Sequence, residues 1–255
     1  AGLITLGGLG FSVLLECLRY RGEARRLSLH ARLVLVTSGV LLAGGTLAVL
    51  LLEWDNPGTL GALSPGEKLL NALFQSVTFR TAGFASVDQL RLTDGAKLLG
   101  MIQMFIGASP ASTGGGVKTT TLAAVLLLVH STVRGREELN LRGRRLCLST
   151  ARRAVAIVTI ALGMVLACSL LLAVAERGRG FALVDLMYEA VSAFGTVGIS
   201  SAGTPHYTRA SQALLMPMMF LGRVGPLTLA CALAAREERG SSNRVHYPEE
   251  KIMIG

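Results

Sequence analysis

Hydrophobic residues along this chain come in long runs that short polar segments separate. The run from Leu33 to Leu52 holds about 20 residues, the length that an α-helix needs to cross a hydrocarbon layer of about 30 Å. Residues 154–175 and 211–235 form further runs of this kind, and residues 98–130 form a longer one. Residues 1–15 are apolar but too short to cross alone. The pattern predicts an all-α membrane protein.

Two shorter segments, residues 67–79 and 181–194, are too short to span and each leads into a glycine-containing turn. Ser64-Pro65 before the first segment is a helix start signal. Asp185 lies in the first turn of the second, where negative charge suits the helix dipole. Polar residues follow the first turn and lead back to the side of entry. We therefore expect two re-entrant helices.

The two turns are related in sequence and predict an internal duplication. Gly83 and Gly198 are 115 residues apart (198 − 83), and the same offset relates Phe105-Ile106-Gly107 to Phe220-Leu221-Gly222. Glycine among small and β-branched residues in an apolar chain is a means of exposing backbone carbonyls to a cation. The alternative is that both glycines are helix caps or packing glycines. Two copies in one register favour the cation-binding interpretation.

Composition and charge agree with a membrane setting. The chain is 51% hydrophobic and only 16% charged, whereas a soluble domain carries about 25% charged residues. The net charge of +9 does not indicate nucleic-acid binding, because the basic residues cluster in short segments between apolar runs. Loops 17–32 and 131–153 and the tail 236–255 are such segments. The positive-inside rule places all three in the cytoplasm and both turns on the opposite side.

Two intramembrane features interrupt the apolar runs. Residues 107–117 are rich in Gly, Ser and Thr and cannot continue a stable helix; a glycine-rich packing kink is the alternative interpretation. Arg223 lies inside an apolar run, where a charge is expensive and usually faces a cavity or a partner. Lys118 either supports the glycine-rich segment or marks the cytoplasmic half of its run. A phosphate-binding loop is rejected, because Val117 precedes Lys118 where the G-x-x-x-x-G-K-[ST] pattern needs glycine.

These motifs resemble the Ktr/Trk/HKT superfamily of potassium transporters, and in particular pore subunits of the KtrB type. The third repeat of that superfamily resembles residues 74–84 with 105–121, and the fourth resembles residues 192–200 with 220–226. Residues 247–255 resemble the C-terminus of KtrB-type subunits. Gly7-Gly8-Leu9-Gly10-Phe11 resembles part of the last helix of repeat two.

The resemblance implies a potassium-channel-like fold of four M1–P–M2 repeats with re-entrant pore helices, pseudo-fourfold in the full-length protein. The segments expected are the end of repeat two (1–16), a cytoplasmic loop (17–32), repeat three (33–130), a second loop (131–153), repeat four (154–235) and a cytoplasmic tail (236–255). The first two filter turns are absent from this chain, so we expect a fragment of a longer protein or a truncated gene.

The resemblance also implies the site residues. The filter carbonyls are those of Thr81, Ala82, Gly83, Phe84, Thr196, Val197, Gly198 and Ile199. The gate is a movable segment under the filter together with an Arg in the ion path, and its residues are Gly107, Ser109, Ser112, Thr113, Gly114, Gly115, Gly116, Lys118 and Arg223. Glycine at the third filter position goes with potassium, whereas Ser in one repeat goes with sodium preference in some plant members.

The function implied is potassium uptake by the ion-translocating subunit of a Ktr/Trk-type system, not an enzyme. K⁺ at the filter is the transported ion, sodium dependence is left open, and no covalently bound cofactor is expected. The alternatives are a sodium or mixed transporter of the same superfamily and a non-transporting accessory subunit. The expected partners are a second copy in a homodimer, a cytosolic ring of nucleotide-binding regulatory subunits and membrane lipids, without nucleic acid. The expected location is the cell membrane, multi-pass, with a cytoplasmic C-terminus.

Overall fold

The computed structural model describes residues 1–19, 27–135, 139–141 and 144–225. The predicted tail and residues 226–235 of the last predicted span lie outside the described residues. The elements in chain order are α1 (Gly2–Leu9), α2 (Phe11–Leu18), α3 (Leu29–Glu53), α4 (Pro65–Thr78), α5 (Asp94–Phe105), α6 (Thr119–Val133), β1 (Leu139–Leu141), β2 (Arg144–Leu146), α7 (Leu148–Ala175), α8 (Leu183–Gly195), η2 (Thr204–His206) and α9 (Arg209–Val224).

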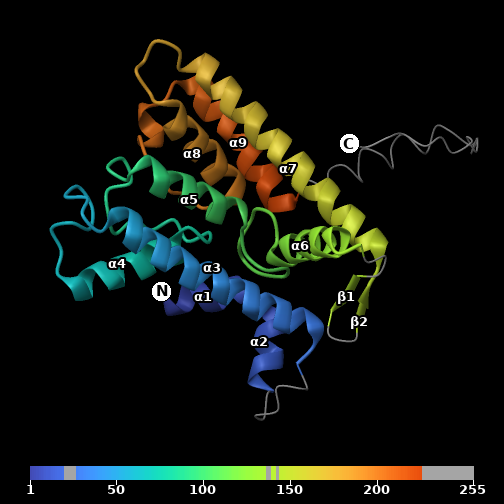
Figure 1. Cartoon of the computed structure of the whole chain (residues 1–255). Helices are drawn as coiled ribbons and strands as arrows, with labels where there is room; N and C mark the ends of the chain where they lie inside the picture. Colours follow the sequence, from blue (N-terminus) through green and yellow to red (C-terminus); the bar gives the residue numbers. More distant parts are fainter. Residues whose placement is uncertain (20–26, 136–138, 142–143, 226–255) are drawn as a thin grey trace, which may run out of the picture.

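Helices α3 and α7 are the two described helices that are both long and apolar enough to cross a membrane. Figure 1 shows them as two long diagonals with the shorter helices α5 and α8 between them. The packing follows that order, since α3 contacts α5, α5 contacts α8 and α8 contacts α7. The short helices are therefore enclosed by the long ones.

The two predicted re-entrant helices are present. Helix α4 begins at a capping box, in which the Glu67 carboxylate accepts from the backbone N and the Oγ of Ser64 at 2.9 and 2.8 Å. Helix α8 ends at Gly195 and is followed by Thr196, a left-handed C-cap residue with φ 52°. Because both helices stop at the predicted turns, the arrangement of a spanning helix, a short helix and a further helix occurs twice.

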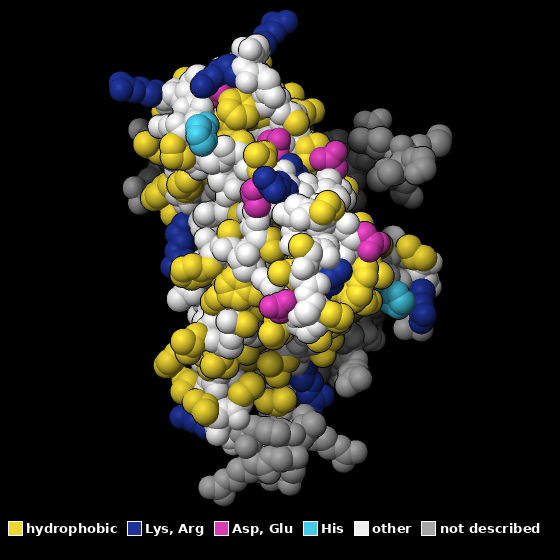
Figure 2. Space-filling view, turned by 90° about the vertical axis from the view of Figure 1, so that its left-hand side faces the viewer, with side chains coloured by type: hydrophobic (Ala, Val, Ile, Leu, Met, Phe, Trp, Pro, Cys, Tyr) yellow, Lys and Arg dark blue, Asp and Glu magenta, His cyan; other side chains and the backbone are white. Residues whose placement is uncertain are grey.

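A hydrophobic core holds the short helices together. Phe79, Met104, Tyr188, Phe194 and Leu215 are all fully or almost fully buried in it. The outer surface is also apolar: α3 exposes Val36, Val40, Leu47 and Leu51, and α7 exposes Leu162, Leu166, Leu170 and Val174. Figure 2 shows hydrophobic side chains over much of one face, with Asp and Glu in its upper and middle parts. Exposed apolar surface of this extent is typical of contact with lipid.

The structure differs from the sequence prediction at the ends of several predicted segments. Residues 1–15 form two helices, because Gly10 (φ 86°) interrupts them. The predicted loop 131–153 contains a short hairpin, in which β1 pairs antiparallel with β2 and Asn140 faces Arg145. Helix α7 also begins at Leu148, earlier than residue 154, and Arg152 and Arg153 are exposed on it. The basic residues of this region therefore lie partly in the first two turns of α7 and not only in the loop before it.

Candidate functional site

The two turns that follow α4 and α8 have left-handed residues at the same two positions. Thr81 and Gly83 have φ of 66° and 80°, and Thr196 and Gly198 have φ of 52° and 87°. Left-handed φ is uncommon for β-branched residues such as Thr. Positive φ at alternate residues departs from a strand, in which successive carbonyls point in opposite directions. Each turn is thus held in an unusual conformation, and the conformation repeats at the offset of 115 residues.

The turns lie against each other. A Cβ built on Gly83 would be 2.5 Å from the carbonyl oxygen of Val197, closer than real Cβ atoms approach. A Cβ built on Gly198 would meet nothing closer than the Cα of Gly83, at 3.9 Å. The corresponding face of the second turn is therefore open. Two segments far apart in sequence form neighbouring walls of one site.

Buried polar side chains behind the turns fix their position. The Thr78 hydroxyl donates to the carbonyl oxygen of Phe84 at 2.5 Å and accepts from the Phe84 backbone N at 3.0 Å, which closes the first turn on its helix. Arg80, which is 8% exposed, donates to the Ser38 hydroxyl at 3.1 Å. These bonds tie the first turn to both α4 and α3.

A second polar group crosses between the repeats. Gln75 of α4 donates to the Gln89 side-chain oxygen at 2.7 Å, and the Tyr188 hydroxyl of α8 donates to the same oxygen at 3.0 Å. Lys97 of α5 and Asp185 of α8 form an ion pair of 2.8 Å with side chains that are 7% and 11% exposed. Because the Tyr188–Gln89 hydrogen bond and the Lys97–Asp185 ion pair join the two repeats, they fix the separation of the two turns.

The glycine-rich segment 107–117 lies against both turns. A Cβ on Gly114 would be 2.3 Å from the Thr81 Oγ1, and the Gly115 backbone N donates to the Thr196 Oγ1 at 3.0 Å. The ends of the segment are joined, since the Val117 N donates to the Phe105 carbonyl at 3.0 Å. The segment is therefore a closed excursion between α5 and α6 whose glycines contact the first residue of each turn.

Backbone hydrogen bonds anchor this segment from two sides. On the α1–α2 side, the Ser109 N donates to the Gly8 carbonyl at 3.0 Å and the Phe11 N donates to the Ala111 carbonyl at 3.1 Å. On the α9 side, the Gly116 N donates to the Gly222 carbonyl at 3.2 Å. The break at Gly10 follows from this packing, because a Cβ there would be 2.4 Å from the Pro110 carbonyl oxygen.

Two cations also hold the segment. The Lys118 ammonium donates to the Gly114 carbonyl at 2.5 Å, and the exposed Arg223 guanidinium donates to the Thr113 carbonyl. The sequence left two roles open for Lys118. Its contact with Gly114 is the contact expected if Lys118 supports the glycine-rich segment. Two further candidates interact with each other within the segment, as the Ser112 hydroxyl donates to the Ser109 carbonyl at 2.5 Å.

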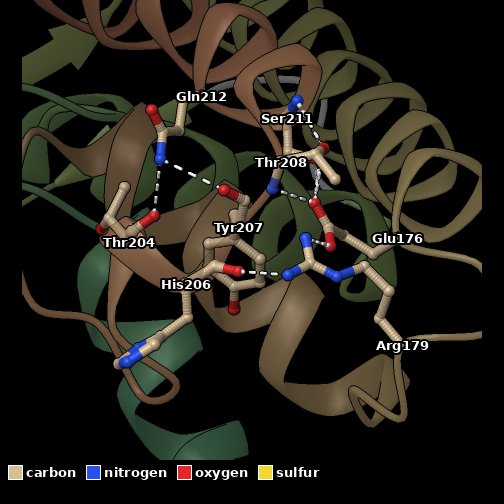
Figure 3. A network of polar contacts seen from close by, with 8 residues as sticks. All are labelled: Glu176, Arg179, Thr204, His206, Tyr207, Thr208, Ser211 and Gln212. Carbon is tan, nitrogen blue, oxygen red and sulfur yellow. Dashed lines mark hydrogen bonds and ion pairs between the residues drawn. The ribbon is translucent and has the colours of Figure 1, made fainter.

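Sequence reasoning missed a pair of buried carboxylates, Glu53 and Glu176, at the ends of α3 and α7. Figure 3 shows Glu176 accepting from the backbone N and the hydroxyl of Thr208, both at 2.7 Å, and from the Ser211 hydroxyl. Glu53 accepts from the backbone N and hydroxyl of Thr93 in the same way, at 2.9 and 2.6 Å. Each carboxylate joins a spanning helix to the N-cap of the helix after the turn.

A signal for these carboxylates exists in the sequence. Thr93 and Thr208 are separated by the same offset of 115 residues (208 − 93), whereas Glu53 and Glu176 are 123 apart (176 − 53) and so escape a search at fixed offset. Burial acts to raise the pKa of Glu176, but hydrogen bonds from Ser211 and Thr208 outweigh it, and the pKa lies below its ordinary value. The group therefore stays ionised at neutral pH.

Replacing Glu53 by Gln should destabilise the protein. Glu53 is fully buried and also accepts from Thr59 and Asn56, so the substitution removes hydrogen bonds to a charged acceptor, worth about 1.5–3 kcal/mol. We expect a lower thermal unfolding midpoint for the purified full-length protein. Asp55→Asn, which neutralises an exposed carboxylate two residues away, is the matched control and should leave the midpoint unchanged. Equal midpoints for both variants would contradict the role given to Glu53.

Comparison with known proteins places the chain among cation transporters. A family model described as "Cation transport protein" (TrkH) matches residues 1–245. Ktr system potassium uptake protein B of Vibrio alginolyticus is 35% identical, with 100% of this chain and 55% of the relative covered. The protein of the same name in Bacillus subtilis is also 35% identical, with 99% and 55% covered. Potassium/sodium uptake protein NtpJ of Enterococcus hirae is 34% identical, with 100% and 56% covered.

A solved structure has the same fold. The potassium transporter TrkH from Vibrio parahaemolyticus matches with a TM-score of 0.69 at 18% identity, covering 90% of this chain and 50% of that one. The chain spans about half the length of the relatives it matches. The all-α membrane fold predicted from sequence is confirmed by this likeness, with the short β1–β2 hairpin as a local exception.

Proposed function

This chain belongs to the TrkH family of cation transport proteins, and from that premise we propose that it forms two quarters of a potassium-uptake pore. The observation that carries the proposal is the pair of turns with matching left-handed residues, Thr81 and Gly83 in one and Thr196 and Gly198 in the other. The filter oxygens are the backbone carbonyls of residues 81–84 and 196–199. Rings of such carbonyls replace the hydration shell of K⁺ in potassium-selective filters.

The contacts of the two turns support a ring rather than a closed pair. Gly83 is in contact with the second turn, at Val197, whereas the corresponding face of Gly198 is open in this chain. In a ring, each turn contacts the next one as the Gly83 turn contacts Val197. The open face of Gly198 would then contact a filter turn from a part of the protein outside this chain. The full pore is then built from four such turns, of which these are the third and fourth.

The glycine-rich segment is proposed as the gate. It contacts Thr81 and Thr196 at one end of each turn, so an ion that leaves the filter meets it next. Its attachment includes backbone hydrogen bonds and the two cations Lys118 and Arg223, whereas Val117 at its end packs in the hydrophobic core. The gate residues are Gly107, Ser109, Ser112, Thr113, Gly114, Gly115, Gly116, Lys118 and Arg223.

The surroundings of the pore follow from the same premise. We place the basic ends of α3 and α7 and the C-terminal tail in the cytoplasm of a multi-pass cell-membrane protein. The proposed partners are a second copy of the protein and a cytosolic nucleotide-binding regulatory ring, which the basic loops would meet. A mixed sodium/potassium transporter is the second candidate, since the relative NtpJ is named for both ions.

The test is ion flux through the full-length protein. Purified protein in vesicles should carry K⁺ down a gradient and exclude Na⁺, and the same protein should restore growth at low potassium to cells without other uptake systems. Comparable flux of both ions would favour the mixed transporter. Inserted, stable protein that carries neither ion would overturn the proposal in favour of an accessory subunit. Vesicles without protein provide the baseline.

A further inference from the structure

A cavity of about 450 Å³ lies between α3, α6 and α7, away from the two turns. It is formed by the N-terminal parts of α3 and α7 and the first half of α6, which Figure 1 shows meeting at one end of the molecule. Its walls are largely apolar and include Leu29, Leu33, Ala124, Leu127, Ala154 and Ile157. None of these residues belongs to the proposed filter or gate.

The rim of this cavity is polar and basic. Arg153, Thr150 and His30 line it and are exposed. Among the residues that the structure describes, no carboxylate pairs with Arg153. Among the described residues, Glu16 is an acidic group near His30, and its carboxylate accepts from the backbone N and hydroxyl of Ser28 at 2.5 and 2.8 Å. Arg153 is therefore the group at the rim that offers an uncompensated charge.

The fold adds to this charge. His30 lies in the first turn of α3, where the helix dipole is positive, and Arg153 lies in the second turn of α7. Both helices also follow basic segments, at the end of the molecule that the positive-inside rule assigns to the cytoplasm. An anionic group is attracted to such a rim, and an apolar chain is attracted to the cavity behind it.

We propose that this cavity binds an anionic phospholipid of the adjacent leaflet, with an acyl chain between α3, α6 and α7 and the phosphate at Arg153. Basic pockets between spanning helices are suited to phospholipid head groups. A free phosphate would leave the apolar walls without a ligand, and a zwitterionic lipid would bring a cation to the rim beside Arg153. Apolar side chains exposed on both long helices, such as Val36 and Leu162, leave the cavity within reach of lipid.

The site also touches the helix that leaves the candidate gate. Thr120, Thr121 and Ala124 line the cavity, and α6 begins at Thr119 directly after Lys118. The Thr119 hydroxyl is hydrogen-bonded to that of Ser109 at 3.1 Å, inside the glycine-rich segment. A bound lipid would therefore favour one position of α6 and, through it, of the segment. This effect on flux rests on the proposed function, whereas lipid binding does not.

The experiment measures lipid retention by the full-length protein, independently of transport. Protein purified with phosphatidylglycerol and phosphatidylcholine is analysed by native mass spectrometry. We expect retained phosphatidylglycerol, and about fivefold weaker retention for Arg153→Gln, the effect of one basic residue near a lipid phosphate. Arg152→Gln removes the same charge from the neighbouring exposed residue, which does not line the cavity, and should keep retention unchanged.

Three results would overturn the proposal. Equal loss of phosphatidylglycerol in Arg152→Gln and Arg153→Gln would indicate diffuse surface charge, and no loss in either would remove the site. Equal retention of phosphatidylcholine and phosphatidylglycerol would remove the role of Arg153. Cross-linking between two copies through Ile157→Cys, in a background without other cysteines, would show that a second copy covers the cavity.

Discussion

Replacing Gly83 by Ala in the full-length protein is expected to reduce potassium uptake at least about tenfold while the protein still inserts. The left-handed conformation costs an L-residue roughly 1–2 kcal/mol of local stability, and the contact that the new methyl group makes is what affects ion coordination. The new Cβ would lie 2.5 Å from the Val197 carbonyl oxygen, so that oxygen must move. Since Val197 is a proposed filter residue, ion coordination is lost together with the local geometry.

Gly178→Ala is the matched control for this prediction. Gly178 has φ 82°, almost the same as the 80° of Gly83, but a Cβ there would meet nothing within 4 Å. The control therefore carries the backbone strain without the contact, and it should transport K⁺ normally. Uptake is measured as initial rate against K⁺ concentration, with Na⁺ as competitor. Normal affinity and sodium exclusion in Gly83→Ala would remove the filter assignment.

Gly198→Ala tests the ring arrangement. Within this chain, a Cβ on residue 198 would meet only the Cα of Gly83, at 3.9 Å. If no other part of the protein contacted this face, Gly198→Ala would reduce uptake less than Gly83→Ala. A ring closed by two further quarters predicts an equal effect, because the open face of Gly198 would then be covered. Comparable loss in the two variants would support the ring.

The repeated architecture could be predicted from sequence because it depends on local and periodic signals. The apolar runs predicted α3 and α7, the Ser64-Pro65 start signal placed the beginning of α4 to within two residues, and the glycine-rich interruption predicted the break between α5 and α6. Each signal follows from chain length in a bilayer or from the backbone preferences of Gly and Pro. The roles of the filter and gate residues stay predictions.

Contacts between distant residues could not be predicted in this way. The Tyr188–Gln89 hydrogen bond and the Lys97–Asp185 ion pair join residues about 90 to 100 positions apart, and nothing in either local sequence specifies the partner. The sequence places Asp185 in the first turn of α8, where it interacts with the helix dipole, but does not predict its ion pair with Lys97. The break at Gly10 likewise needed the position of Pro110, which only the folded structure supplies.

Neutralising Arg223 is expected to increase the maximal rate of potassium uptake. A fixed charge about 6 Å from a cation costs it roughly 3 kcal/mol at an effective dielectric of about 20, near a hundredfold in occupancy. Arg223 also donates to the Thr113 carbonyl, so Arg223→Gln weakens an anchor of the candidate gate as well. Both effects act in the same direction on flux, and the exposed position of Arg223 predicts that the variant folds.

Arg223→Lys separates the charge from the anchor, because Lys keeps the charge but lacks the planar guanidinium fork. A faster rate in Arg223→Gln alone would identify the electrostatic barrier, and equal acceleration in both variants would identify release of the Thr113 carbonyl. Arg209→Gln, at the other end of α9 and also exposed, is the control for a general loss of charge and should leave the rate unchanged. Slower uptake together with a lower unfolding midpoint in Arg223→Gln would show instead that Arg223 stabilises the fold. Loss of a gate residue is expected to increase flux through a protein that remains stable.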